Sequence, residues 1–144
     1  MKLRDYQSDL VERLRAEYQR GAKSVCAVLP TGGGKTAIFS EIARSAGARG
    51  KNVIILVHRH ELLVQASRAL TAFETPHGVI AAGKNRDFSK HVQVGSVQTV
   101  SRRLDSIKPD LIVTDECHHA TSATYTRIYE AFPRAHHLGV TALS

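Results

Sequence analysis

The segment Pro30–Thr36 reads Pro-Thr-Gly-Gly-Gly-Lys-Thr and lies between a short apolar run and a stretch with helical periodicity. Glycines let successive backbone N–H groups turn inward around phosphate oxygens, and the N-terminus of a following helix adds the positive end of its dipole. In such a loop Lys35 would reach the β- and γ-phosphates, and the hydroxyl of Thr36 would ligate Mg²⁺. The strict pattern has a glycine where this chain has Leu29, but the Gly-Lys-Thr core still predicts a phosphate loop. The residues expected to contact the nucleotide in this loop are Pro30, Thr31, Gly32, Gly33, Gly34, Lys35 and Thr36.

Two carboxylates, Asp115 and Glu116, stand directly past the apolar run that begins at Leu111. An acidic pair in such a place is costly unless a cation or a reacting water uses it. In P-loop NTPases an aspartate at this position helps to hold Mg²⁺. The glutamate, one residue on, would polarise the water that attacks the γ-phosphate. Together with a phosphate loop roughly 80 residues upstream, the pair predicts an ATP site.

A second metal hypothesis concerns the run Cys117-His118-His119, with His136 and His137 as further ligands. Adjacent side chains on an extended segment point apart, and neither a C-x₂-C nor an H-x₃-H spacing occurs, so a structural zinc ion is not expected. The other cysteine, Cys26, stands within a predicted strand and is expected to be a small core residue.

Two hydrophobic periodicities alternate along the chain and set out the elements that must position these residues. Helical spacing predicts helices over 5–20, from after the glycines to 47 or 50, over 62–73 and over 125–132. Short apolar runs predict strands over 25–29, 53–57, 78–81, 92–97, 111–113 and 137–140. Strands that alternate with helices indicate a single α/β domain over residues 1–144, a mainly parallel sheet with helices on both faces.

Composition fits one globular domain that carries an excess of positive charge. The 144 residues are 42% hydrophobic, with 20 Lys and Arg against 13 Asp and Glu and a net charge of +7. This balance is compatible with a polyanionic partner such as nucleic acid, although the positive residues are spread out and form no block. The longest apolar run, Val53–Val57, is far short of a membrane span. With only two cysteines and no visible secretory signal, we expect a cytoplasmic protein, with association to a nucleoid or to viral replication open.

With Asp115-Glu116-Cys117-His118 in place, the chain resembles the first RecA-like motor domain of superfamily 2 helicases, of the DEAD/DEAH-box or type III restriction-motor kind. The resemblance covers all 144 residues, with the motifs in the family's order and motif II spelled DECH. The Q-type motif, motif I, motif Ia and the next nucleic-acid motif resemble Leu3–Gln7, Leu29–Thr36, Leu56–Leu62 and Val94–Val100. Within the superfamily, the stretch Val94–Leu104 and the DECH spelling are most similar to RadD-like DNA-repair helicases.

The resemblance implies a role for each matched residue. Arg4 and Gln7 would bind the nucleotide, with the Gln7 amide recognising an adenine edge, and His118 would relay the state of the ATP site toward the nucleic acid. The catalytic group would be Lys35, Asp115, Glu116 and His118, with Thr36 and Asp115 on Mg²⁺. The sugar–phosphate backbone would be gripped by Arg59, His60, Ser96, Gln98 and Thr99, and Arg102 and Arg103 would add charge at the rim. Such contacts carry no base readout, so binding independent of sequence is expected.

The chain departs from the family pattern at its C-terminal end. Family members carry Ser-Ala-Thr or Thr-Ala-Thr-Pro after the last strand, whereas Leu143 takes the second hydroxyl position here. This departure puts the coupling role of that motif in question. A second RecA-like lobe, which supplies arginine fingers to the γ-phosphate in the family, is expected to be absent from these residues. Because such charge stabilisation is worth roughly 10³–10⁵ in rate, we expect weak ATP binding and very slow hydrolysis from this chain alone.

Three functions follow from the sequence. The first is an ATP-driven helicase or translocase motor domain that uses Mg²⁺, with DNA favoured over RNA. The second is a non-catalytic module that binds nucleic acid or a protein partner. The third is a P-loop kinase for a small molecule, which has less support because no acceptor-binding lid is visible.

Overall fold

Six parallel strands form one sheet in the computed structural model of the chain, which describes residues 3–29, 32–83, 87, 89–116 and 122–142. The strand order is β1-β6-β5-β2-β4-β3, and every neighbouring pair is parallel. The strands are β1 (Ser24–Leu29), β2 (Val53–Val57), β3 (His77–Ile80), β4 (Val92–Ser96), β5 (Leu111–Asp115) and β6 (His136–Ala142). All six lie where the apolar runs predict them, so the expected α/β fold with a parallel sheet is confirmed.

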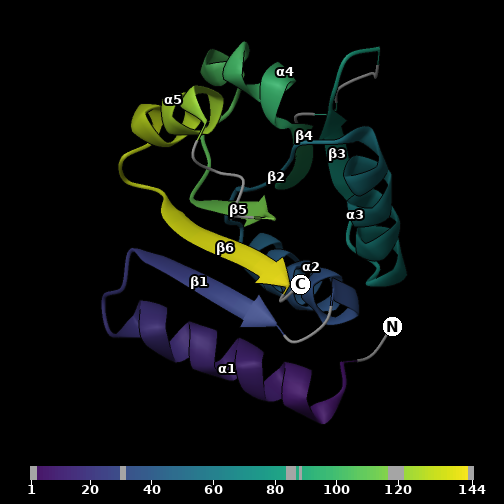
Figure 1. Cartoon of the computed structure of the whole chain (residues 1–144), viewed down its shortest axis with the longest axis vertical. Helices are drawn as coiled ribbons and strands as arrows, with labels where there is room; N and C mark the ends of the chain where they lie inside the picture. Colours follow the sequence, from purple (N-terminus) through teal and green to yellow (C-terminus); the bar gives the residue numbers. More distant parts are fainter. Residues whose placement is uncertain (1–2, 30–31, 84–86, 88, 117–121, 143–144) are drawn as a thin grey trace.

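Helices cover both faces of this sheet, as Figure 1 shows. They are α1 (Asp5–Gln19), α2 (Gly32–Ala48), α3 (His60–Ala72), α4 (Val97–Ser101), α5 (Ala123–Ala131) and the 3₁₀ turn η1 (Leu104–Ser106). The first three pack on one face and α4 and α5 on the other. None of the helices described here is long and apolar enough to cross a membrane.

The central strand β2 explains why a five-residue apolar run is a strand and not a helix. Each of its residues is buried, because alternate side chains enter opposite cores. Ile55 lies in the core under α1, α2 and α3, whereas Ile54 and Leu56 lie in the core under α4 and α5. A strand covered on both faces must be apolar throughout, which is the pattern of parallel sheets.

Most boundaries differ from the prediction by one or two residues, and one of these differences changes the type of element. The sequence predicts a strand that includes Val97, but β4 ends at Ser96 and Val97 begins the short helix α4. Val97 and Val100 are both buried and face the same core, at the three-residue spacing of a helix. The close approach of α4 requires the glycine at 95, since a Cβ there would lie 2.4 Å from Val100 Cγ2.

The expectation that Cys26 is a core residue is wrong. β1 is an edge strand, and one face is covered by α1 and α2 while the other is open (Figure 1). Ala27 and Leu29 point into the core, whereas Cys26 and Val28 are exposed, the latter to 54%. The alternation of a strand assigns every second residue to one face, but the local sequence does not state whether that face is covered.

Candidate functional site

The carboxyl ends of the strands meet at one edge of the sheet, where open α/β sheets bind ligands. The register pairs Asp115 at the end of β5 with Val140 of β6, and Leu29 at the end of β1 with Ala142. Helix α2 begins at this edge directly after β1. The first turn of α2 therefore faces the acidic end of β5, as the order of the sequence motifs requires.

Lys35 links these two elements through its ammonium group. Its Nζ donates to Asp115 Oδ1 at 2.6 Å and to Glu116 Oε1 at 2.5 Å. The three side chains are 8%, 4% and 21% exposed, so Asp115 is the deeper carboxylate and Glu116 is nearer to solvent. Residues 80 positions apart thus form one charged cluster, which we call the carboxylate–lysine triad.

The electrostatics of the triad favour a charged lysine. Burial lowers the pKa of Lys35, but the hydrogen bonds and negative charges of Asp115 and Glu116 raise that pKa above its ordinary value. Glu116 also adopts a φ of +56°, a left-handed backbone conformation that is unfavourable for a residue other than glycine. Strain of this kind is stored at functional sites when the surrounding structure holds it.

The donor set around the triad fits a divalent cation. Two carboxylates converge on one point, and the ammonium of Lys35 already stands between them as a positive charge. Thr36 is the next residue of α2 after Lys35 and is half-buried. Its hydroxyl therefore belongs to the same N-terminal part of α2 as the Lys35 ammonium. Oxygen donors from carboxylates and hydroxyls are the ligands that Mg²⁺ prefers.

Gln7 lies in the first turn of α1, and Arg4 directly precedes this helix, which packs against α2. The backbone N–H of Arg4 donates to Gln7 Oε1 at 2.9 Å, which fixes the buried Gln7 side chain. A Cβ on Gly34 would lie 3.7 Å from Gln7 Nε2 and 3.4 Å from the hydroxyl of Tyr6. The structure therefore brings Gln7 to Gly34, while Arg4 is exposed.

Several predicted site residues fall outside the described part of the chain. They are Pro30, Thr31, Cys117, His118, His119 and Leu143. Gly32 and Gly33 are described only as backbone in the first turn of α2. The structure therefore does not test the roles predicted for these residues.

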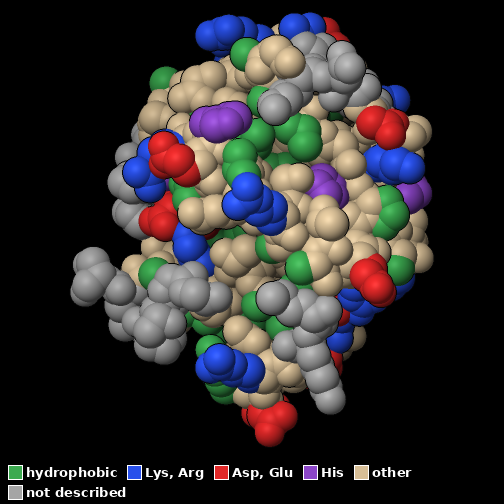
Figure 2. Space-filling model, turned by 90° about the vertical axis from the view of Figure 1, so that its right-hand side faces the viewer, with side chains coloured by type: hydrophobic (Ala, Val, Ile, Leu, Met, Phe, Trp, Pro, Cys, Tyr) green, Lys and Arg blue, Asp and Glu red, His purple; other side chains and the backbone are tan. Residues whose placement is uncertain are grey.

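The residues predicted to grip nucleic acid follow β2 and β4, which are neighbours in the sheet. Arg59 is exposed with its Nε 4.0 Å from a Glu61 oxygen, and the exposed His60 begins α3. Ser96 Oγ donates to Gln98 Oε1 at 2.9 Å, and Thr99 lies one residue further on in α4. On the face that carries α3, Lys and Arg side chains are scattered among acidic ones (Figure 2). No single cluster of basic side chains therefore marks a nucleic-acid surface on that face.

Sequence reasoning missed a hydroxyl pair beneath the acidic end of β5. Thr114 Oγ1 and the hydroxyl of Tyr129 are 2.6 Å apart, and Thr114 directly precedes Asp115. Burial raises the pKa of Tyr125 to about 12, and the charges of Tyr129 and Asp115 add to the effect. The helical stripe in α5 identifies both tyrosines as packing residues, but nothing in their spacing indicates that a hydroxyl reaches β5.

Comparison with known proteins identifies the relatives of this chain. The model of the family described as type III restriction enzyme, res subunit, matches residues 1–144. The putative ATP-dependent helicase IRC3 of Saccharomyces cerevisiae is 38% identical over 143 residues, which cover 90% of this chain and 21% of that protein. The DNA 3'-5' translocase XPB2 of Sulfurisphaera tokodaii is 29% identical over 145 residues, 99% of this chain and 31% of that protein.

Solved structures agree on the fold. The UvsW helicase from bacteriophage T4 superposes with a TM-score of 0.74 at 20% identity, over 99% of this chain and 52% of that one. The chain thus spans about half of that structure and between a fifth and a third of the two curated relatives.

Proposed function

The chain belongs to the family described as type III restriction enzyme, res subunit, as the first RecA-like domain of a superfamily 2 helicase, and on that premise we propose that it binds ATP with Mg²⁺ and drives movement along DNA. The observation that carries the proposal is the carboxylate–lysine triad, which joins the start of α2 to the end of β5. The names of the relatives, an ATP-dependent helicase and a DNA translocase, support both ATP and DNA.

In this proposal Lys35 changes partners when the nucleotide binds. Its ammonium now holds two carboxylates, whereas a triphosphate would offer more negative charge, and the backbone N–H groups at the start of α2 would donate to its oxygens. Lys35 would then donate to the β- and γ-phosphates, and Asp115 and Thr36 would hold Mg²⁺. Bound there, Mg²⁺ neutralises charge that develops on the phosphates.

The different depths of the two carboxylates divide their roles. Asp115, almost fully buried, would hold the metal, whereas the more exposed Glu116 would orient a water and accept its proton. Gln7, held by the Arg4 amide and adjacent to Gly34, would recognise the adenine edge. His118 would carry the state of this site toward the nucleic acid.

DNA would lie across the ends of β2 and β4. The side chains offered there are polar or basic and largely exposed: Arg59, His60, Ser96, Gln98 and Thr99. They suit contacts to sugars and phosphates and would bind without regard to base sequence.

A second RecA-like lobe completes the motor in this proposal. The chain spans only a fifth of IRC3 and a third of XPB2, so the remaining length of such proteins has room for that lobe. Hydrolysis by residues 1–144 alone would be very slow, because an arginine finger from the other lobe is worth roughly 10³–10⁵ in rate.

Fluorescent ATP titrated with Mg²⁺, with and without single-stranded DNA, tests the proposal. We expect binding that Lys35→Ala abolishes and that Arg44→Ala, which removes an exposed guanidinium that pairs with Glu41 in the same helix, leaves intact. Binding of DNA without any binding of ATP would reject the motor proposal in favour of a non-catalytic nucleic-acid module.

A further inference from the structure

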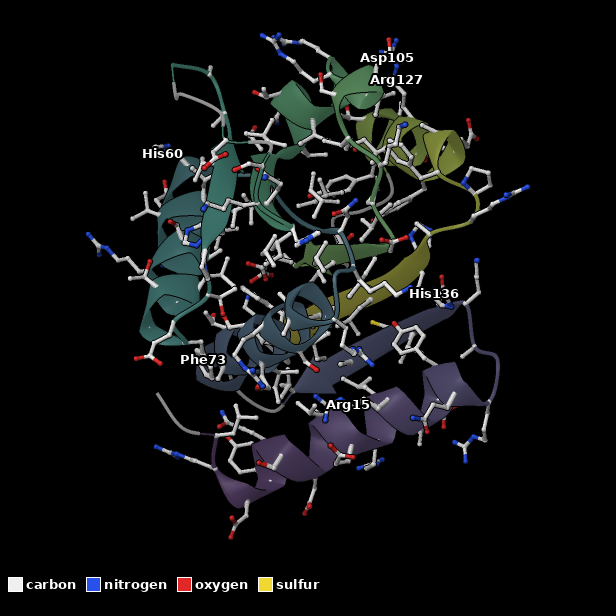
Figure 3. The ribbon with its side chains drawn as sticks, turned by 180° about the vertical axis from the view of Figure 1, so that it is seen from behind. Arg15, His60, Phe73, Asp105, Arg127 and His136 are labelled. Carbon is white, nitrogen blue, oxygen red and sulfur yellow. The ribbon has the colours of Figure 1, made fainter. Side chains whose placement is uncertain are left out.

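A cavity of about 430 Å³ lies at the amino edge of the sheet, opposite to the carboxylate–lysine triad. It opens between α1, α2 and the starts of β5 and β6. Figure 3 labels two of its lining residues, Arg15 on α1 and His136 at the first position of β6. Asp115 ends the strand that Leu111 begins, so the cavity and the proposed ATP site lie at opposite ends of β5.

Apolar groups make up much of the lining. Leu14, Ile42, Ala46 and Leu111 contribute aliphatic surface, and Tyr18 contributes its ring. The Tyr18 hydroxyl donates to the backbone oxygen of His137 at 2.5 Å, so its polar end is already satisfied. None of the described buried polar atoms that lack a hydrogen-bond partner belongs to this lining.

Positive charges surround the apolar lining. The exposed side chains of Arg49 and Lys51 come from the turn between α2 and β2, and that of Arg134 comes from the turn before β6. Arg15 adds a half-buried guanidinium whose Nη2 donates to Ser45 at 3.0 Å, although Glu12 pairs with its other nitrogen. Among the described lining residues Asp110 is the one carboxylate, and its Oδ2 accepts the Asn52 backbone N–H at 2.8 Å.

We propose that this cavity binds an acidic peptide segment of a partner protein. A bulky apolar side chain would enter the lining formed by Ile42 and Leu111, and neighbouring carboxylates would meet Arg49, Lys51 and Arg134. The volume falls within the roughly 300–1,000 Å³ of ligand pockets. Burial of an apolar anchor supplies affinity, while the surrounding charge selects an acidic partner and speeds its association.

The lining favours a peptide over a nucleic-acid strand. A nucleotide base in this cavity would bury the polar atoms of its edge against Leu14, Ile42 and Ala46, which offer no hydrogen bonds. An aliphatic or aromatic side chain has no hydrogen bonds to lose there. Asp110 would also repel a continuous row of phosphates, whereas a peptide can place a neutral residue opposite it.

Fluorescence anisotropy of the whole chain with a labelled hexapeptide, four aspartates followed by leucine and phenylalanine, tests the proposal. The charge-reversal variant Arg49→Glu/Lys51→Glu should weaken binding by about tenfold or more. The matched control Arg68→Glu/Arg127→Glu makes the same change in net charge at exposed positions of α3 and α5, and it should alter binding by less than about twofold.

A second peptide with glycine and serine in place of leucine and phenylalanine tests the apolar anchor, and a six-nucleotide oligothymidine tests the other ligand class. Binding of the two peptides with equal affinity would overturn the proposal, since the cavity would then take no part. The proposal would also be overturned if both double variants weakened peptide binding equally. It would be overturned as well if the oligothymidine bound in a way that requires Arg49 and Lys51 while the peptide did not bind. Because none of these probes uses ATP, the result is independent of the proposed motor function.

Discussion

Replacement of Lys35 by methionine should destabilise the chain by removing the positive charge that lies between two carboxylates. Their oxygens lie 2.6 and 2.5 Å from the Lys35 nitrogen and therefore within about 5 Å of each other. Two unit charges at that distance repel by about 3 kcal/mol at an effective dielectric constant near 20. Loss of one partner from a buried ion pair costs a similar amount, ~3–5 kcal/mol. We therefore expect the free energy of unfolding to fall by about 3 kcal/mol, or Tm by roughly 10 °C.

Mg²⁺ should reverse part of this loss. A divalent cation can take the place of the ammonium between Asp115 and Glu116, so millimolar Mg²⁺ should raise the Tm of Lys35→Met while leaving the wild type almost unchanged. Thermal melts at pH 7.5, with and without Mg²⁺, measure the effect.

The matched control is Arg20→Met, which removes an ion pair with Glu17 at the end of α1, where both side chains are exposed. It should cost no more than about 0.5–1 kcal/mol, because exposed ion pairs contribute little. A Lys35→Met chain as stable as Arg20→Met at pH 7.5 would refute the reasoning, since the triad would then not hold the site together. Equal Mg²⁺ stabilisation of wild type and Lys35→Met would refute the idea that the lysine and the metal compete.

Three further outcomes are expected. Gly95→Ala should cost ~1–3 kcal/mol in denaturant unfolding, because its Cβ would lie 2.4 Å from Val100 Cγ2, and Val100→Ala in the same chain should recover part of that loss. Thr114→Val and Tyr129→Phe should each lower the free energy of unfolding by about 1 kcal/mol. Because both remove the same 2.6 Å contact, their effects should be non-additive in a double-mutant cycle, and fully additive losses would argue against a stabilising contact. Burial lowers the pKa of His137 below 6.5, and nearby positive charge adds to the effect. The unfolded chain therefore binds a proton more readily than the folded chain, so the free energy of unfolding should fall as the pH drops below about 6.5. Thermal melts of His137→Gln should show a shallower fall with pH.

Much of the fold could be predicted from sequence because the central strand β2 is apolar on both faces. The run Val53–Val57 can be buried only if helices cover both sides of the sheet, which implies a parallel α/β arrangement. Val97 was harder to assign, since a valine after a valine-rich strand continues the strand pattern. Only the packing of α4 on Gly95 shows that the chain turns there.

Exposure on β1 could not be predicted for a different reason. The composition of Ser24–Leu29 is that of a buried strand, yet Cys26 and Val28 are exposed. Whether an edge strand has a helix on its second face depends on elements remote in the chain, and the local pattern carries no information about them. The same limit applies to the amino-edge cavity, whose lining comes from four separate elements.

The sequence predicts that Lys35 and Asp115 lie at the same edge of the sheet, but not the contacts that they make there. Motif spacing predicts that Lys35 and Asp115 meet, because both follow strands that end at one edge of a parallel sheet. It does not predict that the ammonium would sit between two carboxylates, since each residue is expected to face the nucleotide or the metal. The Thr114–Tyr129 contact was equally hidden, because a tyrosine on a buried helical stripe is explained by packing alone.

The triad links the two ligands of the proposed site through one positive charge. Lys35 donates to both Asp115 and Glu116, so a metal that binds there without nucleotide would have to displace this buried ammonium from both carboxylates. A triphosphate would offer the ammonium another anion, and the metal would in turn supply the positive charge that the carboxylates lose. Each ligand would then lower the cost of binding the other, and by linkage the coupling would be the same in both directions. Within a single lobe, this exchange would let the chain discriminate Mg²⁺–ATP from either component before any second lobe closes on the site.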